Sequence, residues 1–187
     1  GYLAHGVTSV RNVAGLPVHL RWADRIEDGA LLGPTLLTTG PILNSPGPNA
    51  QQNHVLVMTG EEARAAVRRQ HQQGYRHLKV YSNLTEDAYR GVLEEARALG
   101  LTVSGHTPEG VREPGIPLER DFLIPFTSLL DDGFLTIEHT ESIVWHGLRD
   151  RLNAQRMQQL AGEMAQAGVV VTPTLIAHDN LVRVAES

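Results

Sequence analysis

Short stretches in which hydrophobic and polar positions alternate are separated along this chain by segments with apolar residues at helical spacing. Side chains repeat every two residues in a strand and every 3.6 residues in a helix, so the two patterns predict different elements. Strands are predicted at residues 7–13, 35–42, 76–82, 101–106, 134–139 and 169–175. This order is typical of repeated βα units with parallel strands.

Three of the intervening helices have clear boundaries, because each begins at a capping residue and ends before a glycine. Thr59 and Glu62 match a capping box, in which side chain and backbone at the helix start bond reciprocally. The three helices are predicted at about 59–73, 85–99 and 153–167, and a weaker fourth at 20–31.

Six βα units in 187 residues give about 31 residues per unit, the same length as in a closed eightfold barrel of roughly 250 residues. An open doubly wound sheet usually shows a Gly-rich turn after its first strand, and residues 13–17 contain none. We therefore expect α/β architecture, with residues 1–187 forming a single partial domain of a TIM-type (β/α)8 barrel. The missing initiator Met suggests that the polypeptide begins inside a larger fold.

The amino-acid composition mainly excludes certain classes of function. The 16 Lys and Arg against 21 Asp and Glu give a formal charge of −5 without long single-sign runs, which argues against a nucleic-acid partner. No apolar run approaches the roughly 18 residues of a membrane span. The absence of cysteine excludes disulfide and thiolate chemistry but leaves the compartment open.

In a parallel barrel, functional side chains gather at the C-terminal ends of the strands. Lys79 and Tyr81 stand near the end of one strand and, by alternation, point to the same side, into the barrel if Leu78 and Val80 pack on helices. A buried ammonium needs a partner, neutralisation or chemical modification, such as carboxylation to an anionic oxygen ligand. The alternative is a strand-end lysine that reaches solvent.

His106 and His139 end the next two predicted strands at equivalent places. One strand-end histidine is more often a hydrogen-bonded structural residue than a ligand. Two on adjacent parallel strands, roughly 5 Å apart, can reach one metal ion, since imidazole is a common ligand of zinc. Three candidate ligands on consecutive strands favour a metal site.

Other polar residues near the strand ends are weaker candidates. Arg11 is placed to bind a substrate carboxylate or to cap its strand, and three histidines in connections are placed to contact substrate. Glu138 and Glu141 are interpreted as helix-facing or solvated residues. The three histidines are His54, His146 and His178.

Five stretches carry a family pattern in their order and spacing. They are 6–12 (GVTSVRN), 78–82 (LKVYS), 103–108 (VSGHTP), 137–141 (IEHTE) and 170–175 (VVTPTL). With them the chain resembles, over nearly its whole length, the imidazolonepropionase-like and Xaa-Pro-dipeptidase-like branch of the amidohydrolase superfamily.

The resemblance implies a metal-dependent hydrolase that cleaves amide C–N bonds of peptide-like or cyclic amides through a metal-activated water. Lys79, often carboxylated in such enzymes, would be the ligand on strand 4, His106 on strand 5 and His139 on strand 6. One or two divalent ions, zinc first, would be the cofactor, and Tyr81 would contact the substrate or the intermediate.

The same resemblance implies groups that would lie outside this chain. A His-x-His pair at the end of strand 1 would precede Gly1, and a catalytic aspartate at the end of strand 8 would follow Ser187. We therefore expect a fragment covering about strands 2 to 7, and we expect no activity of the isolated chain.

Two other readings remain open. One is an inactive remnant that folds only by pairing its open barrel edges, 7–13 and 169–175, with another chain or a second copy. The other is a lyase or isomerase that uses Lys79 as a Schiff-base nucleophile, against which His106 and His139 argue.

Overall fold

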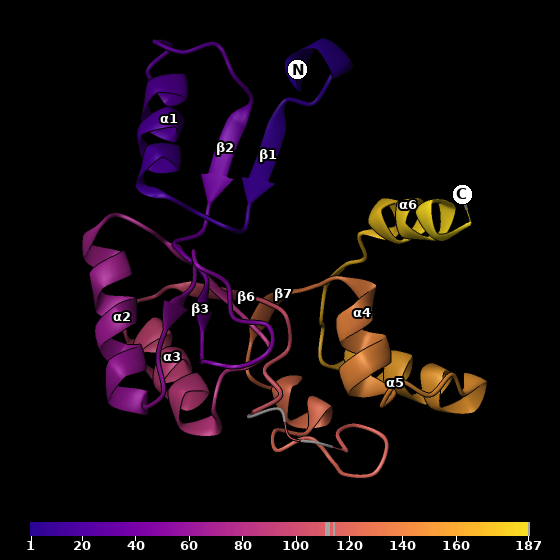
Figure 1. Ribbon diagram of the computed structural model, residues 1–187. Helices are drawn as coiled ribbons and strands as arrows, with labels where there is room; N and C mark the ends of the chain where they lie inside the picture. Colours follow the sequence, from indigo (N-terminus) through magenta and orange to yellow (C-terminus); the bar gives the residue numbers. More distant parts are fainter. Residues whose placement is uncertain (111–112, 114, 187) are drawn as a thin grey trace.

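The computed structural model describes residues 1–110, 113 and 115–186, along which short strands alternate with helices (Figure 1). The strands are β1 (Ser9–Asn12), β2 (Thr35–Thr38), β3 (Leu43–Asn44), β4 (Val55–Leu56), β5 (His77–Val80), β6 (Thr102–Gly105), β7 (Phe134–Glu138) and β8 (Val171–Thr172). The α-helices are α1 (Pro17–Glu27), α2 (Gly60–Gln72), α3 (Glu86–Ala98), α4 (Thr140–Ser142), α5 (Ala154–Gln166) and α6 (Leu175–Ala185). The other helical turns are η1 (Leu3–His5), η2 (Phe126–Leu129) and the π-helical η3 (Ile143–Gly147).

All strand pairs in the described residues are parallel. β1 pairs with β2, and a second sheet has the order β4-β3-β5-β6-β7-β8. The chain connects the two sheets at Thr39 and Gly40. The amide of Thr39 donates to the carbonyl of Asn12, and the amide of Gly40 donates to the carbonyl of His77 in β5.

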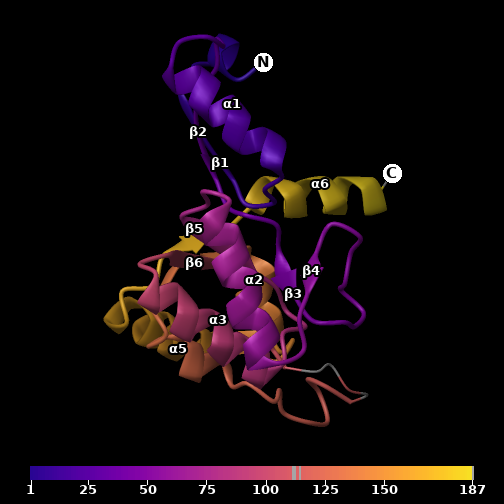
Figure 2. The ribbon, with the colours of Figure 1, turned by 90° about the vertical axis from the view of Figure 1, so that its left-hand side faces the viewer.

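The strand order of the larger sheet is mostly that of a barrel. From β5 to β8, each strand pairs with the next strand along the chain, and the two-residue β4 lies on the other edge of β3. Helices α2 and α3 lie together on one side of these strands in both ribbon views (Figures 1 and 2). The fold is thus α/β with the strand succession of a partial barrel, as predicted.

The main core lies between the sheet and its covering helices. Leu78 and Val80 of β5 are fully buried there against side chains of α2 and α3, including Val67 and Val92. The capping box at Thr59 forms as predicted, because its hydroxyl accepts from the Glu62 amide and the Glu62 carboxylate accepts from the Thr59 amide. These contacts fix the ends of the helices that cover the strands.

The predicted boundaries fail in four places. Helix α1 starts at Pro17 rather than at residue 20, since proline suits the first helical position. The predicted strand 35–42 ends at Thr38, before Pro41, which cannot donate to a ladder, and strands β3 and β4 form within residues 43–58, where no strand was predicted. The predicted strand 169–175 shrinks to β8, and α6 follows it where no helix was predicted.

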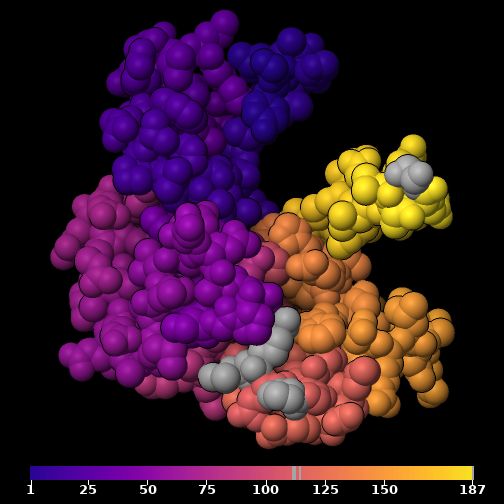
Figure 3. All heavy atoms as spheres, in the orientation of Figure 1, coloured from indigo at the N-terminus to yellow at the C-terminus, as the bar shows by residue number. Residues whose placement is uncertain are grey.

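Helix α6 stands away from the main body, as does the segment that contains β1, β2 and α1, with an open recess between them (Figure 3). No residue of α6 is buried, and several of its large apolar side chains are exposed. Among the described residues, no helix combines the length and the apolar character that a membrane crossing requires.

Candidate metal and substrate site

Lys79 lies inside the partial barrel. Leu78 and Val80 face the helices, so alternation along β5 turns the Lys79 side chain to the opposite face, where it is 2% exposed. Among the described residues, its Nζ atom has no hydrogen-bond partner. Burial lowers the pKa of Lys79 to about 8, although the negative charge of Glu138 opposes this shift. The lysine is therefore a buried amine whose proton is held weakly.

Four aromatic rings form a row, one from the residue before β4 and three from the residues after β5, β6 and β7. The ring centroid of Tyr81 lies 4.0 Å from that of His106 and 5.0 Å from that of His54. His106 and His139, from the ends of β6 and β7, have centroids 4.6 Å apart. The structure thus brings the two histidines predicted as ligands into direct contact, with Tyr81 beside them.

His106 is uncharged at neutral pH. Burial lowers its pKa to about 4, outweighing the hydrogen bond with Glu141, which acts in the opposite direction. The 3.2 Å contact between His106 Nε2 and Glu141 Oε1 is therefore a hydrogen bond from a neutral ring rather than an ion pair. His106 Nδ1 is buried and has no partner in the part of the chain that the structure describes, so a lone pair remains for a ligand.

His139 adopts an unusual backbone conformation, with φ 69° and ψ 137°. Its Nδ1 atom lies 2.6 Å from the hydroxyl oxygen of Thr174, and its amide donates to the carbonyl of Thr172. Burial, followed by the positive charge of Lys79, lowers the pKa of His139. The ring is therefore held in place by the end of β8.

Arg11 reaches across the interior from β1. Its guanidinium donates to Glu138 Oε1 at 2.8 Å, to Thr136 Oγ1 at 2.7 Å and to Thr172 Oγ1 at 2.9 Å. The carboxylate that Arg11 binds in this structure is therefore that of Glu138, a residue of the same chain. The interpretation of Glu138 as helix-facing or solvated is wrong, because Ile137 faces the helices and Glu138, 2% exposed, faces inward.

The three histidines in connections have different surroundings. His54 is buried, its Nδ1 lies 3.2 Å from Asn44 Nδ2, and its Nε2 has no partner within residues 1–110, 113 and 115–186. Burial, and then the charge of Lys79, lower the pKa of His54. His178 lies on α6, close enough for its charge to contribute to lowering the pKa of His139. His54 thus faces the candidate site directly.

His146 does not face substrate, and that prediction is wrong. The side chain is 2% exposed, and both ring nitrogens are bonded, Nδ1 to Thr107 Oγ1 at 2.9 Å and Nε2 to the carbonyl of Ile124 at 2.7 Å. Its ring also packs against Phe122 and Phe126. His146 is a structural residue that joins η3 to the connection after β6.

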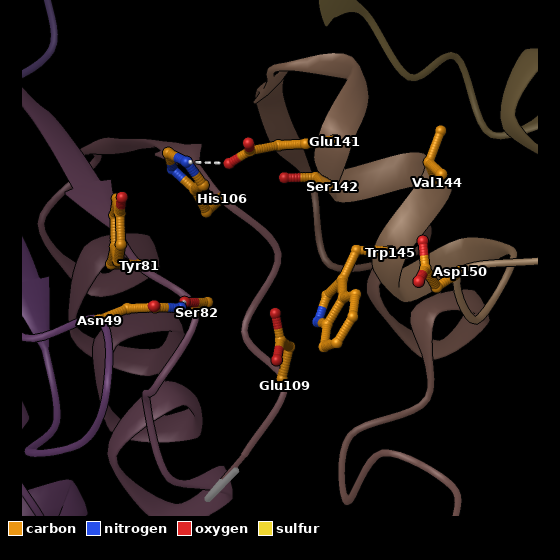
Figure 4. Close-up of a pocket in the computed structure, with 10 residues that line it drawn as sticks. All are labelled: Asn49, Tyr81, Ser82, His106, Glu109, Glu141, Ser142, Val144, Trp145 and Asp150. Carbon is orange, nitrogen blue, oxygen red and sulfur yellow. Dashed lines mark hydrogen bonds and ion pairs between the residues drawn. The ribbon is translucent and has the colours of Figure 1, made fainter. Parts of the chain in front are cut away.

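A cavity of about 390 Å³ opens beside His106. Figure 4 shows the side chains of Tyr81, His106, Glu109, Glu141 and Trp145 around it, from the ends of β5 and β6 and from the turns after β7. The sequence pattern missed Glu109 and Trp145. Their only signal was their position in connections that follow strands, on the side where barrel sites form.

The donor set of the site consists of two imidazoles and one amine. Across the residues that the structure describes, no three side chains among His, Cys, Asp and Glu converge as a metal site. However, Lys79 Nζ and His106 Nδ1 are buried polar atoms without partners, and such atoms normally find one. The residues therefore fit a divalent ion when Lys79 supplies a ligand and further ligands complete the shell.

No protein-family model matches the sequence, and no curated protein matches it either. Several solved structures do. A Xaa-Pro dipeptidase with bound methionine shares 19% identity at TM-score 0.66, over 97% of this chain and 45% of its own. A bottromycin amidohydrolase shares 23% identity at TM-score 0.64, over 87% and 33%. A Bifidobacterium longum protein described as a prolidase shares 25% identity at TM-score 0.55, over 74% and 34%.

This chain spans between a third and a half of the length of these three structures. The dipeptidase match takes in 97% of this chain, so it includes most of the succession of parallel strands and helices that carries Lys79, His106 and His139. By fold, the chain is therefore similar to part of the barrel in these structures, which are described as an amidohydrolase, a dipeptidase and a prolidase.

Proposed function

We propose that this chain forms part of a metal-dependent hydrolase that acts on amide C–N bonds of small or peptide-like substrates. The observation that carries the proposal is the convergence of Lys79, His106 and His139 from three successive strands. Two of these side chains hold a buried nitrogen without a partner. A divalent ion, zinc first and one or two in number, would supply an activated water and polarise the amide carbonyl.

The two histidines suit the role of ligands because a ligand must offer a lone pair. Burial lowers the pKa of both rings, that of His106 to about 4, so neither needs to lose a proton at neutral pH before it binds a metal. Glu141 accepts the hydrogen bond from His106 and holds its ring. This leaves His106 Nδ1 facing the interior as the donor atom.

Lys79 suits carboxylation. Only the neutral amine attacks carbon dioxide, and the product is a carbamate anion with release of one proton. With a pKa of about 8, Lys79 is partly neutral under mildly alkaline conditions, whereas an exposed lysine is not. We propose that Lys79 binds the metal through carbamate oxygens.

Tyr81 and His54 are proposed to bind the substrate. Burial raises the pKa of Tyr81, and the charge of Glu141 raises it further, so its hydroxyl keeps its proton and can donate to a substrate oxygen. His54 Nε2 is buried beside the Tyr81 ring, and Asn44 fixes the other nitrogen of His54. Both groups therefore offer a fixed hydrogen-bonding atom close to the ligands.

A metal-binding experiment tests the proposal. The 187-residue chain is titrated with Zn²⁺ by isothermal calorimetry, in buffer with bicarbonate, beside a His106→Ala/His139→Ala variant. The variant should lose binding. His5→Ala is the control, since His5 lies exposed in η1 far along the chain from the site and should leave binding unchanged. Equal affinity of the double variant and the unmodified chain would sink the proposal.

A Schiff-base reaction is the second candidate, favoured by the lowered pKa of the buried Lys79 amine. Borohydride reduction in the presence of a simple aldehyde or ketone separates the two. We expect no covalent product at Lys79 by mass spectrometry. A stable adduct there, absent in Lys79→Met, would favour the lyase or isomerase.

Activity of the isolated chain is not part of the proposal. The histidine pair and the aspartate of the family pattern have no counterparts in residues 1–187, and the solved structures that match are two to three times as long. Within the described residues, β1 pairs with β2 alone and β8 with β7 alone. We propose that further strands, or another copy of the chain, pair with these free edges.

A further inference from the structure

The ends of β7 and β8 meet at two residues with unusual backbone angles. His139 has φ 69°, and Thr174, which precedes α6, has φ 57° and ψ 32°. Non-glycine residues in this region are strained, and they persist where their surroundings fix them. The two side chains are bonded to each other, with Thr174 Oγ1 2.6 Å from His139 Nδ1.

Backbone contacts on both sides of the pair hold it in place. The amide of His139 donates to the carbonyl of Thr172 at 2.8 Å. The amide and the hydroxyl of Thr140 both donate to the carbonyl of Pro173, at 3.2 and 2.9 Å. The segment 172–174 is thus joined to 139–140 by four hydrogen bonds, of which the one to the His139 ring has a direct effect on the candidate ligand.

A second contact of the Thr174 hydroxyl bears on the direction of that bond. Its oxygen also lies 3.3 Å from the carbonyl oxygen of Thr172, which can only accept. A hydroxyl has a single hydrogen. When that hydrogen points to Thr172, the oxygen of Thr174 accepts from the ring, and His139 must carry its proton on Nδ1.

We infer that Thr174 is a positioning residue that fixes His139 in the tautomer with the proton on Nδ1, so that Nε2 presents its lone pair to the metal. Which nitrogen of a ligating histidine is available depends on the hydrogen bond that the other nitrogen makes. The inference rests on the proposed metal site and deepens it.

His106 and His139 would then bind through different nitrogens. In His106, Nε2 bonds Glu141 and Nδ1 remains for the metal. In His139, Nδ1 bonds Thr174 and Nε2 remains for the metal. The two partners also differ in kind, because Glu141 is a carboxylate in the turn after β7 and Thr174 is a neutral hydroxyl at the start of α6. The position of α6 therefore bears directly on the orientation of one candidate ligand.

The first test reads the tautomer without metal. Long-range ¹H–¹⁵N spectra of the ¹⁵N-histidine-labelled chain distinguish a proton on Nδ1 from one on Nε2, and the His139 signals are assigned by their loss in His139→Gln. We expect a proton on Nδ1 in the unmodified chain and a mixture of tautomers in Thr174→Val. A proton on Nε2 of His139 in the unmodified chain would overturn the inference.

The second test measures Zn²⁺ affinity in Thr174→Val and Thr174→Ser. Loss of a bond to the far nitrogen of a ligating histidine weakens metal binding about 10- to 100-fold, which we expect for valine. Serine retains the hydroxyl and should restore the affinity. Valine and threonine have nearly the same shape, so circular dichroism of the metal-free variants should match.

The outcomes separate the inference from the proposed function. If the unmodified chain binds no Zn²⁺, the proposed function fails, and the spectra still decide the tautomer. If the unmodified chain binds Zn²⁺ and Thr174→Val binds it equally well, the metal site stands and the role of Thr174 is wrong.

Discussion

The guanidinium of Arg11 in β1 donates to the carboxylate of Glu138 in β7 across 127 residues of sequence, with Nη2 and Oε1 2.8 Å apart. Glu138 is almost fully buried, whereas the Arg11 side chain is 32% exposed. Arg11 also bonds Thr172 in β8. One side chain therefore joins the first strand of the partial barrel to its last two.

Replacing Arg11 by methionine should destabilise the chain by about 2 to 3 kcal/mol, because it leaves the Glu138 carboxylate buried without its cation. The estimate lies below that for a fully buried pair, since the exposed part of Arg11 is screened by solvent. Urea denaturation followed by circular dichroism measures the loss. Adding Glu138→Gln removes the unpaired charge, so the double variant should recover part of the stability. A double variant less stable than Arg11→Met would contradict this account.

Lys79 should make stability depend on pH in a defined window. Burial lowers its pKa from 10.5 in an exposed side chain to about 8. Below pH 8 the native and unfolded chains both carry the proton, and the native state pays the full penalty of a buried charge. Between pH 8 and 10.5 only the unfolded chain holds the proton, so the free energy of unfolding contributed by Lys79 rises with pH.

Lys79→Met tests this dependence. At pH 7, in metal-free buffer without carbon dioxide, the variant should be more stable than the unmodified chain, by as much as about 3 kcal/mol. The difference should shrink as pH rises from 8 to 10. Urea denaturation of both proteins at pH 7, 8 and 10 measures the difference in stability. A stability difference that stays constant over this range would show that the Lys79 proton is held as in an exposed side chain.

His146→Phe should destabilise the chain by about 1 to 3 kcal/mol, since phenylalanine fits an aromatic site but leaves the hydroxyl of Thr107 and the carbonyl of Ile124 without their bonds to the ring. Thermal and urea denaturation both report the change. His5→Phe, at an exposed position, should stay within about 0.5 kcal/mol of the unmodified chain. If His146→Phe were as stable as His5→Phe, the hydrogen bonds of His146 would contribute nothing to the stability of the chain.

Much of the fold was predictable because its periodic signals are local. The capping residues and glycines that bound α2 and α3 act within a few residues, and the runs of β5 and β6 are flanked by these helices. The signal failed where strands are two residues long, as in β3 and β4, since no period can be read from so few positions. The periodic pattern of apolar residues also failed to predict α6, because the apolar residues of this helix do not lie on a buried face.

The candidate site divides in the same way. Lys79, His106 and His139 could be chosen as candidates because each stands at or near the end of a predicted strand, which the sequence shows directly. The partners of these residues lie far along the chain, as Thr174 does from His139, 35 residues away. The orientation of Glu138 was predicted wrongly, although alternation places its side chain on the face opposite Ile137. The cation that binds it, Arg11, lies 127 residues away in the sequence. Contacts across the barrel interior between residues far apart in the sequence can be identified only from the three-dimensional structure.

The last prediction concerns Gly105, which ends β6 and precedes His106. A Cβ atom at this position would lie 2.3 Å from the carbonyl oxygen of Val80 and 2.9 Å from its amide nitrogen, both in the backbone of β5. Backbone cannot yield as a flexible side chain can, so Gly105→Ala must push β6 away from β5. Overpacking of this kind costs about 1 to 3 kcal/mol.

Gly105→Ala should also weaken Zn²⁺ binding, because separating the two strands moves His106 away from Lys79. Gly162→Ala is the matched control, since a Cβ there has no neighbour within 4 Å and alanine favours helix α5. It should raise stability by about 0.5 to 1 kcal/mol and leave Zn²⁺ affinity unchanged. Calorimetric titration and urea denaturation of both variants check the pair. If Gly105→Ala lost stability but bound Zn²⁺ like the control, the spacing of β5 and β6 would not set the geometry of the ligands.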